Sequence, residues 1–238
     1  MRESGKILGL VLAEVEHFIK AGQTTREIDA FAENLIRKHN AVPTFLGYRG
    51  FIASTCISID EEVVHGIPSD RVVQEGNIVT VDCGVTFKGL ITDSAITVGI
   101  GQISPAAQKL INTVYKALDR AIESARPGIR TTEISKTIEK VVDKQGLGIV
   151  EDLSGHGVGL ELHEDPYIFN FYNGQPGPVI QPGMTFAIEP IITIGSPKTK
   201  TLRDNWTIVT KDSSLAAQAE HTIAITEKGC EILTKRPK

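Results

Sequence analysis

The chain has 238 residues, of which 41% are hydrophobic and 23% charged, so it can bury a substantial core. Its net charge of -4 gives no support to an electrostatic nucleic-acid binder. The three scattered cysteines, Cys56, Cys83 and Cys230, predict free thiols in a reducing compartment. No signal peptide is visible, and no apolar run approaches the roughly 18 residues of a membrane helix. We therefore expect a soluble cytoplasmic protein without membrane contact.

Two helices are predicted at the start of the chain. Apolar residues recur at helical spacing over residues 4–20, and Gly22 ends this segment. Thr24, with Glu27 three residues later, forms a capping-box pattern that begins a second helix. The apolar run Ile78 to Val81 then predicts a buried strand that ends in a carboxylate, Asp82.

The second half of the chain repeats this order. Helices are predicted to begin at Ser104-Pro105 and at Thr131-Thr132, and Gly128 ends the first of them. A strand-like run over residues 186–188 again ends in a carboxylate, Glu189. Several matched pairs share a shift of 106 or 107 residues: Gly22 and Gly128, Ile28 and Ile134, Gln74 and Gln181, Gly76 and Gly183, Asp82 and Glu189.

This duplication predicts the architecture. We interpret residues 1–238 as a single catalytic domain with a pseudo-twofold repeat, roughly residues 1–100 and 101–238. Helices that precede clusters of strands in each half favour an α+β fold over an alternating α/β fold. We expect a curved, mainly antiparallel sheet with helices on its outer face and a cleft at the axis.

Each half also supplies two acids that are candidate metal ligands. The acids are Asp82 and Asp93 in the first half, with Glu189 and Glu220 in the second. Buried carboxylates must be paired or metal-bound, and no Lys or Arg stands at a matching position to neutralise Asp82 or Glu189. His156, between Gly155 and Gly157, is the fifth candidate ligand. This oxygen-rich set favours Mn, Fe(II), Co or Mg, and two ions about 3.5 to 4 Å apart could hold a hydroxide nucleophile.

Other catalytic motifs are missing from the sequence. It has no G-x-S-x-G elbow, no P-loop, and no G-x-G-x-x-G between a strand and a helix. His163-Glu164-Asp165-Pro166 is not the H-E-x-x-H zinc signature, so we interpret His163 as a substrate-facing donor. Cys83 alternates away from Asp82 and is expected to be a small buried hydrophobe.

With these residues in place, the chain resembles the type I methionine aminopeptidases of the pita-bread fold, in their minimal bacterial form. The resemblance extends from the first helix to Leu233 and includes the five ligands and these motifs: Val64-His65-Gly66-Ile67-Pro68, Gly155-His156-Gly157-Val158-Gly159, Asn205-Trp206 and Ala219-Glu220-His221-Thr222. It implies removal of the initiator methionine from nascent chains with a small second residue. It also implies two divalent ions of Co, Mn, Fe(II) or Zn, with the physiological metal left open.

The resemblance further implies a role for each site residue. Asp93 and Glu220 would bridge both metals, His156 and Glu189 would complete one site, and Asp82 the other. Glu189 would also be the general base, since the attacking water must lose a proton. Two histidines, His65 and His163, would contact the scissile peptide and stabilise the tetrahedral intermediate. The methionine pocket would be formed by Tyr48, Phe51, Cys56 and Trp206.

Some features leave alternatives open. Arg49 replaces a frequent histidine and Leu162 a frequent aromatic residue near the substrate, which affects specificity rather than chemistry. A proline-directed peptidase on the same fold and a binding protein that has lost catalysis are the competing hypotheses; no ligand is replaced by a neutral side chain, which argues against the second. Transient ribosome association follows from the family role alone, and nothing demands more than a monomer. The residues that could form a basic patch are Lys198, Lys200, Arg203 and Lys211.

Overall fold

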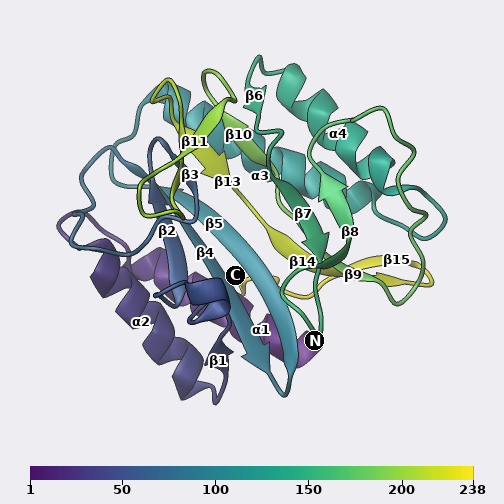
Figure 1. Ribbon diagram of the computed structural model, residues 1–238, viewed down its shortest axis with the longest axis horizontal. Coiled ribbons are helices and arrows are strands. Elements are labelled where there is room, and N and C mark those ends of the chain that lie inside the picture. Colours follow the sequence, from purple (N-terminus) through teal and green to yellow (C-terminus); the bar gives the residue numbers. More distant parts are fainter. Residues whose placement is uncertain (238) are drawn as a thin grey trace.

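Two helices followed by strands form each half of the molecule, as the repeat predicted (Figure 1). The computed structural model describes residues 1–237. The first half contains α1 (Arg2–Phe18), α2 (Thr25–Lys38), β1 (Val42–Pro43), the short 3-10 turn η1 (Tyr48–Gly50), β2 (Thr55–Ile59), β3 (Glu62–Val64), β4 (Ile78–Phe87) and β5 (Leu90–Gly99).

The second half begins with α3 (Pro105–Ser124) and α4 (Thr131–Asp143). Its strands are β6 (Gly148–Ile149), β7 (Ser154–Gly157), β8 (Glu164–Phe169), β9 (Thr185–Ile188), β10 (Ile191–Thr193), β11 (Thr199–Thr201), β12 (Ile208–Thr210), β13 (Ala216–Gln218), β14 (His221–Thr226) and β15 (Gly229–Ile232). Among residues 1–237, no helix is long and apolar enough to cross a membrane.

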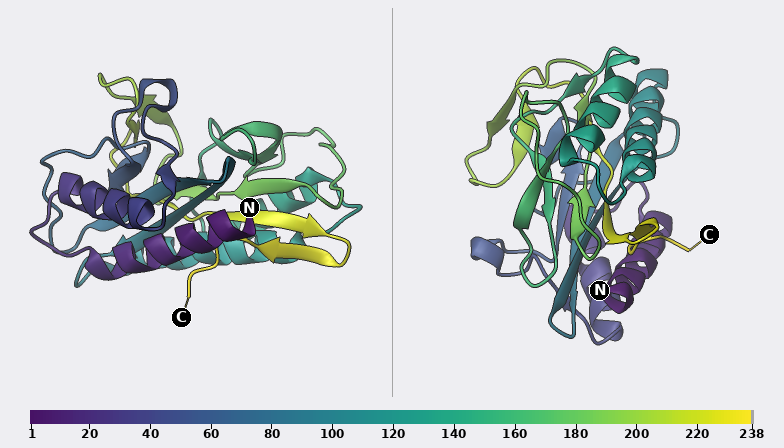
Figure 2. Two further views of the ribbon diagram at one scale, coloured as in Figure 1. Left: turned by 90° about the horizontal axis from the view of Figure 1, so that it is seen from below. Right: turned by 90° about the vertical axis from the view of Figure 1, so that its right-hand side faces the viewer.

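The helices cover one side of the strands. Leu8 and Leu12 of α1 are fully buried in one apolar cluster with Val81 of β4, whereas Leu110 of α3 lies in a second cluster with Phe186 of β9. Figure 2 shows α1 and α3 below the sheet, with η1 rising on the opposite side. All the strand pairs of the described chain are antiparallel. The predicted α+β fold with outer helices is therefore confirmed.

The helix starts lie where the sequence placed them. Thr24 and Glu27 form the complete capping box of α2, and the Ser104 hydroxyl accepts a hydrogen bond from the Ala107 amide at the start of α3. The helix predicted over residues 4–20 spans Arg2–Phe18, so Gly22 lies in the turn beyond its end rather than at its last residue.

The duplication is visible in equivalent hydrogen bonds of the two halves. Gly22 and Gly128 both adopt left-handed backbone, with φ of 91° and 89°. The amide of each glycine donates a hydrogen bond to the carbonyl of an equivalent residue: Gly22 to Val73 and Gly128 to Ile180, both at 2.9 Å. Val73 and Ile180 are separated by the same 107 residues as the predicted strand pairs.

The two halves meet along β5. The Asp93 amide donates to the Thr222 hydroxyl at 2.9 Å, and the Glu220 amide donates to the Ala95 carbonyl at 3.0 Å. The Ser94 hydroxyl donates to the Glu220 carbonyl at 2.6 Å. These bonds place Asp93 and Glu220, one acid from each half, side by side. They support the interpretation of the chain as a single domain, which remains a prediction.

The expectation that Asp82 ends its strand is wrong. β4 continues to Phe87, so Asp82 lies at its centre and pairs with Cys56 of β2 and Ala95 of β5. The strand continues because Val85 and Cys83 keep the helix-facing side fully buried, while Asp82 projects from the opposite face. In the second half, by contrast, Glu189 does follow the last residue of β9.

Candidate active site

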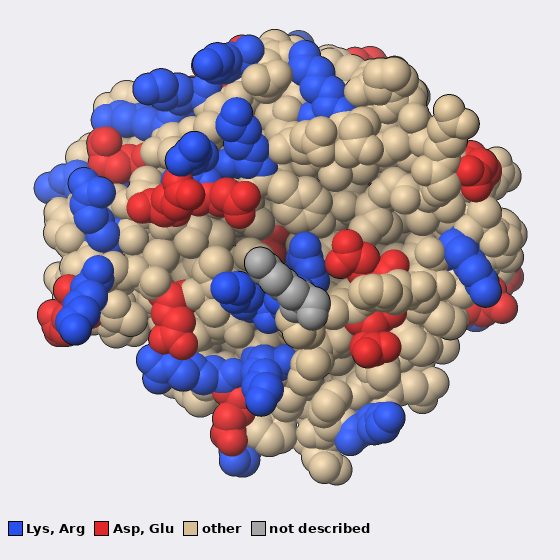
Figure 3. Space-filling view, turned by 180° about the vertical axis from the view of Figure 1, so that it is seen from behind, with Lys and Arg blue, Asp and Glu red and all other residues tan. Residues whose placement is uncertain are grey.

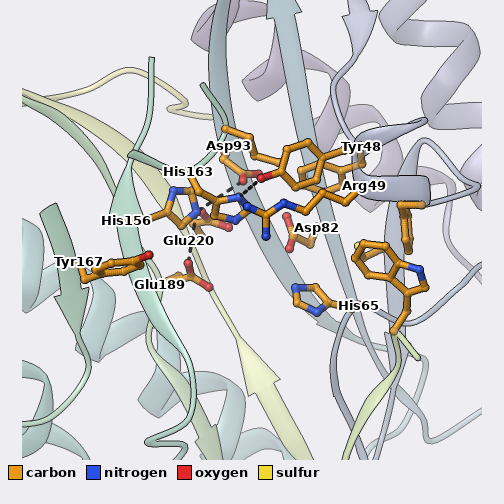
Figure 4. A pocket seen from close by; sticks show the side chains of 15 residues that line it. Tyr48, Arg49, His65, Asp82, Asp93, His156, His163, Tyr167, Glu189 and Glu220 are labelled. Carbon is orange, nitrogen blue, oxygen red and sulfur yellow. Dashed lines mark hydrogen bonds and ion pairs between the residues drawn. The ribbon is translucent and has the colours of Figure 1, made fainter. Parts of the chain in front are cut away.

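The five candidate ligands line one cavity of about 310 Å³ on the face of the sheet opposite α1 and α3 (Figure 4). Asp82 and Asp93 come from neighbouring strands β4 and β5, and His156 comes from β7. Glu189 follows β9, and Glu220 lies between β13 and β14. The cavity therefore draws its polar wall from both halves of the chain.

Glycines on both sides of His156 allow its strand to fit between neighbours. A Cβ atom at Gly155 would overlap the Ala187 carbonyl of β9, and one at Gly157 would overlap the Asp165 carbonyl of β8. Glycine is the residue that permits such a close approach of the backbones.

The tightest group in the cavity contains Asp93, His156 and Glu220, whose potential ligand atoms all lie within 4.8 Å of one another. Nε2 of His156 is 3.6 Å from Oε1 of Glu189 and 3.9 Å from Oδ2 of Asp93. Its Nδ1 lies 3.0 Å from the Gly157 carbonyl oxygen, which can only accept a hydrogen bond. This assigns the ring proton to Nδ1 and leaves Nε2 with a free lone pair facing the carboxylates.

The electrostatics of the acids favour a bound cation. Oδ1 of Asp82, Oδ1 of Asp93 and Oε1 of Glu220 are buried and have no hydrogen-bond partner in the described chain. Burial, together with the negative charge of Asp93, raises the pKa of the carboxyl groups of Asp82, Glu189 and Glu220 well above the usual range. Burial also raises the pKa of Asp93. Oxygen atoms with free lone pairs beside an imidazole nitrogen fit a hard divalent metal ion.

Gln218 holds one of these acids in place, and the sequence did not single it out. Its buried Nε2 donates to Oε2 of Glu189 at 3.0 Å, which leaves Oε1 to face His156. Gln218 lies on β13, and its proximity to Glu189 follows from the β10–β13 pairing rather than from a local pattern. No motif in the sequence could have identified it.

Both predicted substrate-facing histidines border the cavity. The His163 ring lies 4.3 Å from that of His156, and its Nδ1 is 2.7 Å from the Tyr48 hydroxyl. Burial, then the neighbouring His156 and Arg49, lower the pKa of His163 to about 4. Burial also lowers the pKa of His65. With its pKa near 4, His163 is a neutral imidazole at pH 7 that can donate one hydrogen bond without carrying charge.

The opposite wall of the cavity is apolar. Phe51 and Trp206 meet edge to face at a centroid distance of 5.1 Å, and Cys56 is buried beside them. Phe45, which the sequence analysis missed, joins this cluster, and its ring packs so closely on Gly84 that a Cβ there would lie 2.8 Å from it. Tyr48 lies at the edge of the same cluster. All four predicted pocket residues thus line the cavity, although their contact with substrate remains a prediction.

The fold and this site define a metal-dependent peptidase. The family model described as "Metallopeptidase family M24" matches residues 1–227, and the chain belongs to this family. A curated relative, methionine aminopeptidase 1 of Bacillus subtilis, is 45% identical over 235 residues, covering 99% of this chain and 95% of the relative. Within the family, the chain therefore belongs with the methionine aminopeptidases.

Solved structures agree with this assignment. The crystal structure of methionine aminopeptidase from Thermotoga maritima matches with a TM-score of 0.97 and 40% identity, covering 99% of this chain and 95% of that one. A prolidase from Pyrococcus furiosus shares the fold with a TM-score of 0.79 and 25% identity, but this chain covers only 63% of it. The likeness to the prolidase is thus both weaker and partial.

Proposed function

We propose that this enzyme removes the initiator methionine from nascent proteins and peptides whose second residue is small. The observation that carries the proposal is the shared cavity, in which a buried cluster of carboxylates and histidine faces an apolar aromatic wall. An unbranched apolar side chain fits such a wall, and the scissile carbonyl then lies beside the acids. The similarity to methionine aminopeptidases of Bacillus subtilis and Clostridium acetobutylicum supports the same reaction.

We further propose that two divalent metal ions occupy the acidic side of the cavity. Asp93 and Glu220 would bridge them, with His156 and Glu189 completing one site and Asp82 the other. The donor set of four carboxylates and one imidazole accommodates Co, Mn, Fe(II) or Zn. When bound, such ions supply positive charge that lowers the pKa of a water molecule and polarises the scissile carbonyl.

Side chains of the cavity accept the proton and donate hydrogen bonds to the substrate. Glu189 accepts a proton from the attacking water, and the hydrogen bond from Gln218 to its Oε2 leaves Oε1 available for this transfer. His163 is neutral, so when its Nδ1 accepts the Tyr48 hydroxyl hydrogen its Nε2–H can donate to the developing oxyanion. His65 would donate to the peptide from the neighbouring wall.

The reaction is tested with purified protein loaded with Mn²⁺ or Co²⁺. We expect release of methionine from Met-Ala-Ser and at least about 100-fold slower release from Met-Lys-Ser, because a long second side chain must be accommodated beside the scissile bond. An Xaa-Pro peptide serves as the comparison substrate. Preference for that peptide over Met-Ala-Ser, or no methionine release at all, would reject the proposal.

The proposed reaction also suggests where in the cell the enzyme acts and what it contacts. Because nascent chains are the substrate, we place the enzyme in the cytoplasm, acting as a monomer in transient contact with ribosomes. Exposed basic residues on and near the β11–β12 hairpin offer a contact surface: Lys198, Lys200, Arg203 and Lys211. Co-sedimentation with ribosomes that persists after these four are changed to alanine would contradict this surface.

A further inference from the structure

Arg49 is an exposed cation at the mouth of the cavity that contains the acids. Among residues 1–237, no carboxylate oxygen lies within 4.0 Å of its guanidinium. Most of the other arginines, by contrast, form an ion pair with an Asp or Glu side chain. The guanidinium lies against the Tyr48 ring, whose centroid is 5.3 Å from the guanidinium carbon. The hydrogen-bond donors of the guanidinium are therefore available to a ligand in the cavity.

The backbone turn fixes the direction in which the Cα–Cβ bond of Arg49 points. Arg49 has a left-handed φ of 48° between Gly47 and Gly50, which have φ of 87° and 88°. The turn is closed by hydrogen bonds from the Gly47 amide to the Phe51 carbonyl and from the Phe51 amide to the Tyr48 carbonyl. A non-glycine residue in this conformation is unfavourable unless its surroundings hold it there, so the turn sets the direction of the Arg49 Cα–Cβ bond.

The position of Arg49 relative to the reaction follows from its neighbours. In Figure 4 its side chain extends across the cavity toward His163, which lies against the metal-ligand candidate His156. Arg49 is close enough for its charge to contribute to the lowered pKa of His163. Arg49, Phe51 and Trp206 line the same cavity, so a substrate whose methionine side chain lay against the two aromatic rings would leave the cavity past this arginine.

We propose that Arg49 binds a carboxylate of the substrate beyond the scissile bond and so makes the enzyme select acidic over basic sequences downstream of the methionine. The planar fork of a guanidinium matches the two oxygens of a carboxylate, which a neutral or cationic group cannot offer. The carboxylate belongs to an Asp or Glu side chain at the third position, or to the free C-terminus of a tripeptide. This inference rests on the proposed methionine release.

Four amidated peptides separate the possibilities: Met-Ala-Asp-Ser, Met-Ala-Asn-Ser, Met-Ala-Lys-Ser and Met-Ala-Ser, the last compared with its free acid. We expect kcat/KM for the Asp peptide to exceed that for the nearly isosteric Asn peptide by about fivefold, as for a partly exposed ion pair. The Lys peptide should be slower than the Asn peptide. The difference should reside in KM and shrink as salt rises to about 1 M, because exposed charges are screened.

Two variants test the residue itself. In Arg49→Gln the Asp-to-Asn ratio should fall to about one, whereas Arg49→Lys, which keeps the charge without the fork, should retain part of it. Arg120→Gln, on the surface of α3, is the matched control and should keep the full ratio. A free-acid preference with no Asp preference assigns the C-terminal carboxylate as the ligand.

The outcomes also separate this inference from the reaction on which it rests. Suppose that the parent enzyme releases methionine from the Asn peptide, but that Arg49→Gln leaves the preferences for the Asp peptide and for the free acid unchanged. Arg49 then does not bind the carboxylate of the substrate. A parent enzyme without any carboxylate preference overturns the inference without involving the variants. Failure to release methionine from every peptide would instead refute the proposed function.

Discussion

Replacing Asp93 with asparagine tests the electrostatic basis of the site. Asp93 and Glu220 are both buried, and their facing oxygen atoms lie within 4.8 Å. Two unit charges at that separation repel by about 3.5 kcal/mol in an effective dielectric of about 20. Because burial raises the pKa of both carboxyl groups, the metal-free pair can take up a proton instead, which removes part of this repulsion.

The expected result has opposite signs without and with metal. Asparagine keeps the shape of Asp93 and can donate a hydrogen bond to Glu220, so metal-free Asp93→Asn should be more stable than the metal-free parent, by roughly 1 to 3 kcal/mol. Added Mn²⁺ should stabilise the parent strongly and the variant weakly, because binding to the folded state alone raises its stability. Metal content of the variant should fall as well.

The pH dependence gives a second measure of the same repulsion. Carboxyl groups whose pKa is raised by folding bind more protons in the folded than in the unfolded protein. The stability of the metal-free parent should consequently fall as pH rises above about 4, the unfolded value, through the raised folded values. The slope should be smaller in Asp93→Asn.

Urea unfolding of chelator-treated protein at pH 8, repeated with Mn²⁺, measures these differences. Glu151→Gln is a suitable control, since Glu151 is exposed and forms no hydrogen bond or ion pair within residues 1–237. A metal-free Asp93→Asn protein less stable than the parent, or one with normal metal stoichiometry, would refute the reasoning.

Three further changes test the general base, a helix cap and a close approach. Glu189→Gln should lower kcat at least about 100-fold with a smaller change in KM, and unchanged kcat would remove Glu189 as the base. Thr24→Ala should lower the free energy of unfolding by about 1 kcal/mol through loss of the α2 cap. Hydrogen bonds from the Thr24 amide and then from its hydroxyl lower the pKa of Glu27, so the part of the effect that comes from the hydroxyl should be present above the unfolded pKa of Glu27 and lost in acid. A Thr24→Ala effect larger at pH 3 than at pH 7 would contradict it. Gly5→Ala should destabilise by about 1 to 3 kcal/mol despite better helix propensity, because a Cβ there overlaps the Leu233 carbonyl, and a rise in thermal midpoint would contradict that.

The features that the sequence predicted well are those with local causes. The capping box at Thr24 and the Ser104-Pro105 start depend on residues three positions apart, so they can be recognised without a partner element. The duplication was equally readable, because equivalent turns need glycine at equivalent places, as at Gly22 and Gly128. The identity of the four acids and the histidine followed from this repeat and from the family resemblance.

Other features were decided only by tertiary structure. The central position of Asp82 in β4 depends on pairing with β2 and β5, and no run of apolar residues shows where a paired strand ends. Gln218 and Phe45 line or support the site through neighbours far away in the chain, so neither leaves a periodic signal. The orientation of Arg49 likewise requires the strained turn that surrounds it.

The division has one physical reason. The sequence by itself determined which side chains could carry the chemistry, because residue type, capping and turn geometry are properties of a few neighbouring residues. Only the tertiary structure decided which of them meet, because the hydrogen bonds that join β5 to residues 218–222 close loops of more than 100 residues. Burial of charge in that shared seam, which makes the site bind metal, exists only after the two halves have packed together.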